Sequence, residues 1–141
     1  MTQIDRDVVL RKLERIAEDI RLLEPFRGMT LEVYRADVYR RKAVERLLQE
    51  VIEAAVDINS HLIVGSGRPA PDDLHSSFLA LAEMGVIDRE FAAALAPCAG
   101  LRNRLVHEYD RIDDSKVLSA VQQALEQFPA YVARIEAHLA P

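Results

Sequence analysis

The sequence has few of the features that stabilise secreted proteins or hold proteins in membranes. Cys98 is the only cysteine among 141 residues, so no disulfide can form within the chain, which is typical of a reducing compartment. No apolar run approaches the ~20 residues that are needed to cross a bilayer. The N-terminal residues Met1 to Arg6 also lack the apolar segment of a signal peptide. We therefore expect a cytoplasmic protein that does not associate with membranes.

Strand patterns and internal repeats are absent as well. Apolar residues instead recur at steps of three and four, which is the spacing of an amphipathic helix. Three segments show this spacing: Val9, Leu13, Ile16, Ile20 and Leu23; then Val44, Leu47, Val51, Ala54, Ile58 and Leu62; and finally Val117, Val121, Ala124, Phe128, Tyr131, Ile135 and Leu139. The pattern predicts an all-α protein, a single-domain bundle of about five helices that comprises residues 1–141.

Capping residues and prolines predict where the helices begin and end. Thr30 should begin the longest helix, of ~30 residues and about 45 Å. Pro97 should break the chain, and Pro129 should kink the last helix. Phe128 and Tyr131 are expected in the core rather than in a site. Aspartates and a serine are suited to capping three later helices, at Asp72 or Asp73, at Asp88, and at Asp113, Asp114 or Ser115.

The charge balance does not favour tight binding to nucleic acid. The net charge is −5, from 23 acidic and 18 basic residues, whereas phosphate contacts supply most non-specific affinity. Basic residues gather in two places, which are Arg35, Arg40, Arg41, Lys42 and Arg46, and then Arg102, Arg104 and Arg111. A run such as the first is more often a solvated helix face than a binding site. Any contact with nucleic acid is therefore expected to be weak or assisted by a partner.

The segment from Gly100 to Asp110 gathers the residues best suited to a chemical site. Arg102 can hold a phosphate with a planar fork of donors. His107 can exchange a proton near neutral pH. A phosphate-binding group and a proton-transfer group are the minimum needed to cleave RNA without a metal ion. Spacing alone favours a simpler interpretation, in which both residues make only surface contacts on a helix.

The same segment resembles a known family. An arginine, four intervening residues, a histidine, one residue and a tyrosine form the motif of HepT-like toxins in the HEPN superfamily. This chain has Arg102, His107 and Tyr109 at those positions, with Asn103 directly after the arginine. The resemblance continues through Arg68-Pro69-Ala70-Pro71, through Leu81 to Ile87 and through the apolar segment at 43–64.

The resemblance implies a function as well as a fold. Members of this kind are metal-independent endoribonucleases that act as homodimers and form the toxin of a type II toxin–antitoxin module. For this chain we expect RNA cleavage through attack by the ribose 2′-OH. Here Arg102 and His107 would be catalytic, and Asn103 and Tyr109 would bind RNA or support the site. The partner would be an MNT-type nucleotidyltransferase antitoxin, which neutralises the toxin by AMP transfer onto the motif tyrosine, Tyr109.

Helix geometry limits how these residues can meet. At ~100° per residue, Arg102 and His107 lie about 140° apart around a regular helix, whereas Arg102 and Tyr109 lie about 20° apart. Arg102 and His107 could not then grip one phosphate from the same chain. Either the helix unwinds near His107, or a second chain supplies the missing half.

Other chemistries have little support. The histidines His61, His75, His107 and His138 show no metal-ligand spacing, so we expect no metal site and no cofactor. The loop from Gly65 to Asp72 has neither of the known phosphate-binding glycine patterns. The competing hypothesis is a non-catalytic helical module that binds a partner or a nucleotide.

Overall fold

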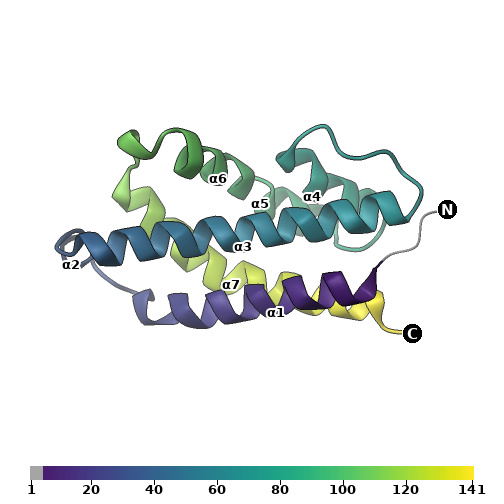
Figure 1. The fold of residues 1–141 in the computed structure, drawn as a ribbon, viewed down its shortest axis with the longest axis horizontal. Coiled ribbons are helices and arrows are strands. Elements are labelled where there is room, and N and C mark those ends of the chain that lie inside the picture. The colour runs from purple at the N-terminus through teal and green to yellow at the C-terminus, as the bar shows by residue number, and fades with distance from the viewer. Residues whose placement is uncertain (1–4) are drawn as a thin grey trace.

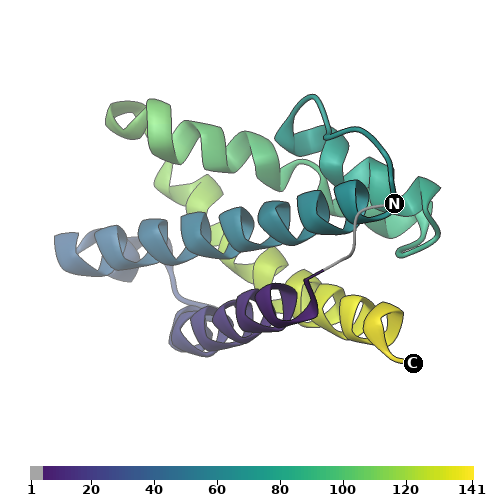
Figure 2. The same ribbon diagram turned by 45° about the vertical axis from the view of Figure 1, so that its right-hand side comes forward.

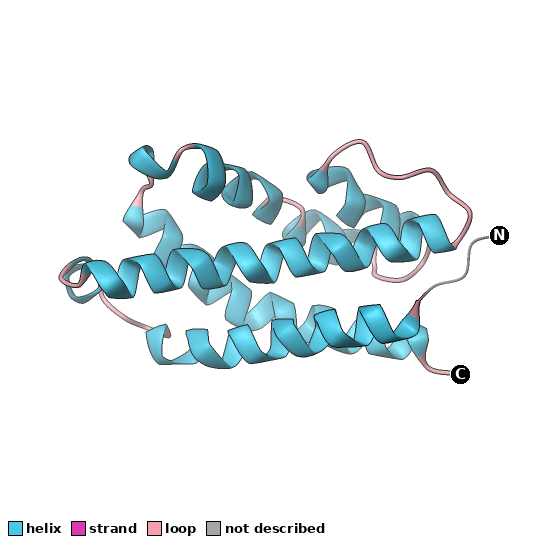
Figure 3. Ribbon diagram, in the orientation of Figure 1, coloured by secondary structure: helices cyan, strands magenta, loops and turns pink. Residues whose placement is uncertain are grey.

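The computed structural model describes residues 5–141, apart from the side chain of Tyr109. Met1 to Ile4, where the absence of a signal peptide was inferred, lie outside the described residues. The α-helices are α1 (Arg6–Leu23), α2 (Leu31–Arg35), α3 (Val38–Gly65), α4 (Leu74–Glu83), α5 (Arg89–Leu95), α6 (Cys98–His107) and α7 (Asp114–Leu139), shown in Figure 1. Two 3-10 turns, η1 (Glu24–Phe26) and η2 (Tyr109–Arg111), complete the chain. The prediction of an all-α fold is confirmed, since no strand occurs in residues 5–141 (Figure 3).

The central element is α3, which at 28 residues is the longest helix. It packs against α1 on one side and against α4 and α6 on the other, while α7 packs mainly against α1. Figures 1 and 2 both show α3 lying between α6 and α1. Its buried residues, among them Leu48, Val51, Ile52 and Ile58, occupy more than one face of the helix. No helix of the described residues is both long and apolar enough to span a bilayer.

The long helix begins later than the sequence predicts. Thr30 does cap a helix, because its Oγ1 accepts a hydrogen bond from the Val33 amide at 3.3 Å, but that helix is the five-residue α2. The chain then breaks at Asp37, whose backbone is extended at φ −128° and ψ 113°. Its carboxylate accepts hydrogen bonds from the amides of Tyr39 and Arg40 and caps α3. The prediction of one helix from Thr30 was therefore wrong, because the Asp37 side chain offers these amides a cap.

The other predicted boundaries agree with the structure. Asp73, Asp88 and Asp113 each accept a hydrogen bond from an amide in the first turn of α4, α5 and α7. Pro97 separates α5 from α6, as expected of a residue that removes a backbone donor. Pro129 lies inside α7, which continues as one helix to Leu139, and the kink expected there stays a prediction.

A buried polar network joins α3, α4 and α7. Asn59 donates from Nδ2 to the Ser77 hydroxyl at 3.0 Å, and Ser77 donates to the Leu74 carbonyl at 2.7 Å. The Tyr131 hydroxyl lies 3.0 Å from the Ala55 carbonyl and 2.5 Å from Asn59 Oδ1. Tyr131 is thus a core residue, as predicted. Because buried polar groups are costly to leave unpaired, the network holds the three helices in one register.

Candidate active site

Helix α6 carries the motif and ends within it. It runs from Cys98 to His107, and Glu108 leaves the helical conformation at φ −129° and ψ 36°. Tyr109 then begins the separate turn η2, and its side chain lies outside the described residues. The predicted angle of about 20° between Arg102 and Tyr109 was therefore wrong, since it required a continuous helix.

Arg102 lies against α3 and is oriented by it. Its guanidinium Nη2 lies 3.6 Å from Glu53 Oε2, and its Nη1 donates to Asn103 Oδ1 at 3.4 Å. Glu53 is itself held by Gln49, whose Nε2 donates to Oε1 at 2.8 Å. The side chain of Arg102 is 25% exposed, so it remains partly accessible to solvent. No sequence pattern indicated Glu53, because its role depends on how α6 packs on α3.

His107 and Asn103 share the solvent-facing side of α6. Both are exposed, and their spacing of four residues places them one turn apart. The helix stays regular between Arg102 and His107, which leaves about 140° between them. The helix does unwind near His107, as one alternative predicted, but only from Glu108 onward, so the unwinding does not bring His107 to the face of Arg102. Within one chain the structure keeps the two predicted catalytic side chains on different faces.

The basic residues of 35–46 are largely engaged with the protein itself. Arg35 and Arg41 lie 3.4 Å and 3.9 Å from the Asp114 carboxylate at the start of α7. Arg40 donates to the Val33 carbonyl at 2.7 Å. Arg46 lies 3.2 Å from Glu50, one turn along α3. These contacts favour the interpretation of this cluster as a solvated structural face.

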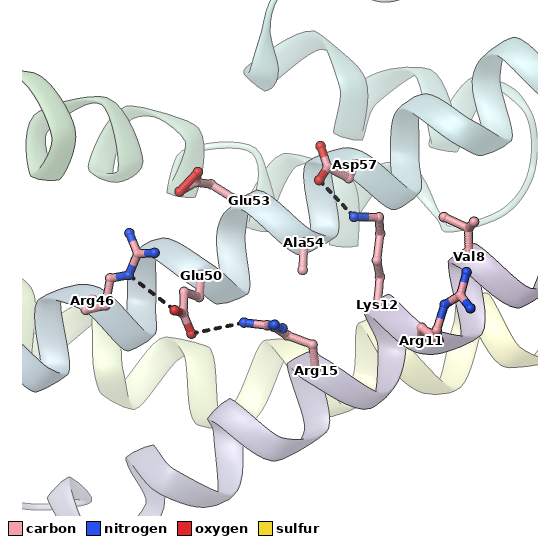
Figure 4. A pocket seen from close by; sticks show the side chains of 9 residues that line it. All are labelled: Val8, Arg11, Lys12, Arg15, Arg46, Glu50, Glu53, Ala54 and Asp57. Atoms are coloured by element: carbon pink, nitrogen blue, oxygen red, sulfur yellow. Dashed lines mark hydrogen bonds and ion pairs between the residues drawn. The ribbon is translucent and has the colours of Figure 1, made fainter.

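A cleft lies between α1 and α3, and no pattern in the sequence indicated it. It has a volume of about 480 Å³, and four basic residues, three acidic residues and two apolar ones line it, namely Arg11, Lys12, Arg15, Arg46, Glu50, Glu53, Asp57, Val8 and Ala54 (Figure 4). Lys12 pairs with Asp57 at 3.1 Å and Arg15 with Glu50 at 3.7 Å. Since acids offset most of its cations, this cleft is better described as an ion-pair bridge between two helices than as an anion site.

Among the described residues, no site for metal or thiol chemistry is evident. Within residues 5–141, no three histidine, cysteine, aspartate or glutamate side chains gather as metal ligands would. His61, His75 and His138 are exposed and scattered. Burial raises the pKa of the Cys98 thiol to about 12. A thiol of this kind stays protonated at neutral pH and is a poor nucleophile.

Several solved structures with this fold are described as toxin–antitoxin structures. One is described as a tri-AMPylated Shewanella oneidensis HEPN toxin in complex with MNT antitoxin; it is 27% identical and aligns with a TM-score of 0.84 over 94% of this chain and 98% of that one. A second, a toxin–antitoxin structure with AMP-PNP, is 26% identical with the same TM-score over 94% of this chain and 99% of that one. The helical arrangement and the motif on α6 thus define a toxin fold of the HEPN type.

The sequence comparison narrows this class to a family. A profile of the ribonuclease HepT-like family matches residues 16–135. The chain belongs to the ribonuclease HepT-like family, which confirms the resemblance seen in the motif. A relative named tRNA nuclease HepT, from Aphanizomenon flos-aquae, is 37% identical over 99% of this chain and 95% of its own length. Another, named mRNA nuclease HepT, from Shewanella oneidensis, is 28% identical over 93% of this chain and 98% of its own length.

Proposed function

We propose that this chain is a metal-independent endoribonuclease, the toxin of a toxin–antitoxin module, and that Arg102 and His107 catalyse the cleavage. The observation that carries the proposal is the placement of the family motif on α6, where His107 is open to solvent and Glu53 orients Arg102. The nuclease names of the relatives support RNA as the substrate. The toxin acts in the cytoplasm, where RNA is available.

The reaction needs two proton transfers and one stabilised charge. His107 accepts the proton of a ribose 2′-OH, and the 2′-oxygen forms a bond to phosphorus. The bond from phosphorus to the 5′-oxygen breaks, and that oxygen takes up a proton from water. Arg102 stabilises the negative charge on the phosphoryl oxygens. The products are a 2′,3′-cyclic phosphate and a 5′-hydroxyl, with Asn103 orienting His107 or the phosphate.

The angle between the two groups supports a homodimer. Because α6 is regular and holds Arg102 and His107 about 140° apart, one chain presents them to different directions. In a dimer, Arg102 of one protomer can face His107 of its partner across a shared cleft. Each active site is then built from both chains.

The partner is an MNT-type nucleotidyltransferase that switches the toxin off by AMP transfer onto Tyr109. The AMPylated toxin–antitoxin complex of a structural relative supports this assignment. Each AMP adds negative charge and bulk two residues from His107, which repels incoming RNA. Because Tyr109 follows the end of α6, the modification does not require the helix to unwind.

Incubation with RNA in excess chelator tests the proposal. The wild type should leave 2′,3′-cyclic phosphate ends, whereas His107→Ala and Arg102→Ala should cleave at least ~10²-fold more slowly, as expected for loss of one catalytic group. Arg68→Ala, an exposed arginine on the loop after α3, is the matched control. Binding without cleavage by the wild type would favour the non-catalytic module. Restoration of cleavage only by a divalent metal would contradict metal independence.

A further inference from the structure

Helices α6 and α7 leave a groove between them that plays no part in the mechanism above. Two cavities, of about 250 Å³ and about 80 Å³, share the lining residues Leu101, Arg104 and Lys116. The two cavities are therefore neighbours, and together they are here called the α6–α7 groove. It is separate from the cleft between α1 and α3, because the two share no lining residue.

The groove combines an apolar floor with a basic rim. Leu48, Ile52 and Phe128 contribute to the floor, and Arg104, Arg111 and Lys116 line the rim. All three cations are exposed, and within residues 5–141 no ion pair engages any of them.

One carboxylate, that of Asp113, also lines the groove. It accepts hydrogen bonds from the Ser115 amide at 3.0 Å and the Ser115 hydroxyl at 2.6 Å. These bonds, with a smaller contribution from the nearby Lys116, lower the pKa of Asp113. Asp113 is thus committed to capping α7 and offsets only part of the positive charge. The groove differs in this from the α1–α3 cleft, where acids match most of the cations.

The basic rim adjoins the proposed catalytic histidine. Arg104 and His107 are three residues apart on α6, so they lie about 60° apart around the helix, one turn from each other. Arg111 follows the end of α6, at the close of η2. A ligand that reaches His107 from this side would therefore pass Arg104 and the mouth of the groove.

We propose that the α6–α7 groove binds one nucleotide of the RNA substrate, the nucleotide next to the cleaved bond. The phosphate of this nucleotide would lie on Arg104 and Lys116, and its base would lie over the apolar floor. This inference rests on the proposed ribonuclease function. Single-stranded RNA alternates an anionic phosphate with a base that has apolar faces, and a basic rim above an apolar floor matches both parts. The larger cavity, at about 250 Å³, is below the ~300–1,000 Å³ typical of pockets for drug-sized ligands, so it suits a single base.

RNA binding by a chain that cannot cleave tests the groove. All variants are made in His107→Ala, and the probe is a fluorescent single-stranded RNA of about ten nucleotides, titrated at several salt concentrations. Arg104→Gln and Lys116→Gln should each weaken binding at least threefold and reduce the salt slope by about 0.7, the value for one contact to single-stranded nucleic acid. Arg68→Gln makes the same charge change on the loop after α3 and should leave both quantities unchanged.

A second variant tests the floor without a charge change. Ala120 lines the groove and is half-buried, so Ala120→Leu should fill part of it and weaken binding with the salt slope unchanged. Ala130→Leu, a half-buried position on α7 that does not line the groove, is the control. Thermal unfolding followed by circular dichroism establishes that each variant is folded.

The outcomes separate this inference from the function on which it rests. If the wild type cleaves RNA but the Arg104 and Lys116 variants bind like Arg68→Gln, the groove proposal is overturned and the ribonuclease stands. If those variants bind RNA normally but lose the antitoxin, the groove is a protein interface and the proposal is also overturned. If the wild type does not cleave RNA, the proposed function fails, and the binding assay still decides whether the groove holds RNA.

Discussion

Asp19 is a buried carboxyl group that should weaken the folded state at neutral pH. Its side chain lies on α1, the residue is 5% exposed, and no donor group among the described residues bonds to its Oδ2. Burial, followed by a hydrogen bond and charge repulsion from Glu50, raises the pKa of Asp19 from 3.8 to about 6, although Arg15 opposes the shift. We predict that Asp19→Asn stabilises the protein above pH 6.

The free-energy cost of ionising Asp19 in the folded protein follows from the shift in its pKa. A change from 3.8 to about 6 is about two units, and each unit corresponds to about 1.4 kcal/mol. Between about pH 4 and pH 6 the unfolded chain has lost this proton while the folded chain keeps it, so stability falls as pH rises. Above about pH 6 both states are ionised, and the full cost, at most about 3 kcal/mol, is present. Asparagine resembles the protonated acid and can still donate to Glu50, so it removes that cost.

Urea denaturation at pH 4 and pH 8 measures the effect. The gain in unfolding free energy from Asp19→Asn should be about 0.5 kcal/mol at pH 4 and between about 1 and 3 kcal/mol at pH 8. Glu18→Gln, which changes an exposed neighbouring carboxylate that pairs with Arg21, should show little of this pH dependence. An effect of the same size at both pH values, or a loss of stability at pH 8, would show that Asp19 is ionised in the folded protein at low cost.

Three further predictions concern the site and its support. Mixing Arg102→Ala with His107→Ala chains should restore part of the ribonuclease activity if the site is composite, whereas no recovery despite subunit exchange would place the site within one chain. Co-expression with its MNT-type nucleotidyltransferase antitoxin should add mass in AMP units on Tyr109, which Tyr109→Phe should prevent; an unmodified tyrosine would refute the switch. Tyr131→Phe should lower the unfolding free energy by about 1–3 kcal/mol in urea, because it leaves Asn59 Oδ1 buried without its donor, and an unchanged midpoint would contradict that role.

Much of the fold could be predicted because its signals are local. The spacing of apolar residues identified the long helices, and side chains such as Asp88 and Pro97 mark boundaries through contacts with their own backbone. The same locality explains the error at Thr30, since Asp37 is an equally good cap seven residues later. The end of α6 at His107 was only one of two alternatives, because nothing in the motif marks the end of a helix.

The sequence was enough to predict which residues form the site, but not which residues surround and contact them. The motif identifies Arg102 and His107 by spacing, whereas the contact of Arg102 with Glu53 joins positions 49 residues apart and follows from packing. The α6–α7 groove is likewise a property of two helices that do not pack closely. Arg104 was visible in the sequence only as part of a basic cluster, and its place beside the groove required the structure.

The incomplete packing of α6 on α7 has a consequence for motion. The buried Asn59, Ser77 and Tyr131 network holds α3, α4 and α7 together, but no member of it belongs to α6. Segments with fewer buried contacts open at lower free energy than the whole domain. We expect α6 and η2 to open as a local unit while the three networked helices remain folded. The motif could then adjust its geometry to an RNA or to a modifying enzyme without global unfolding.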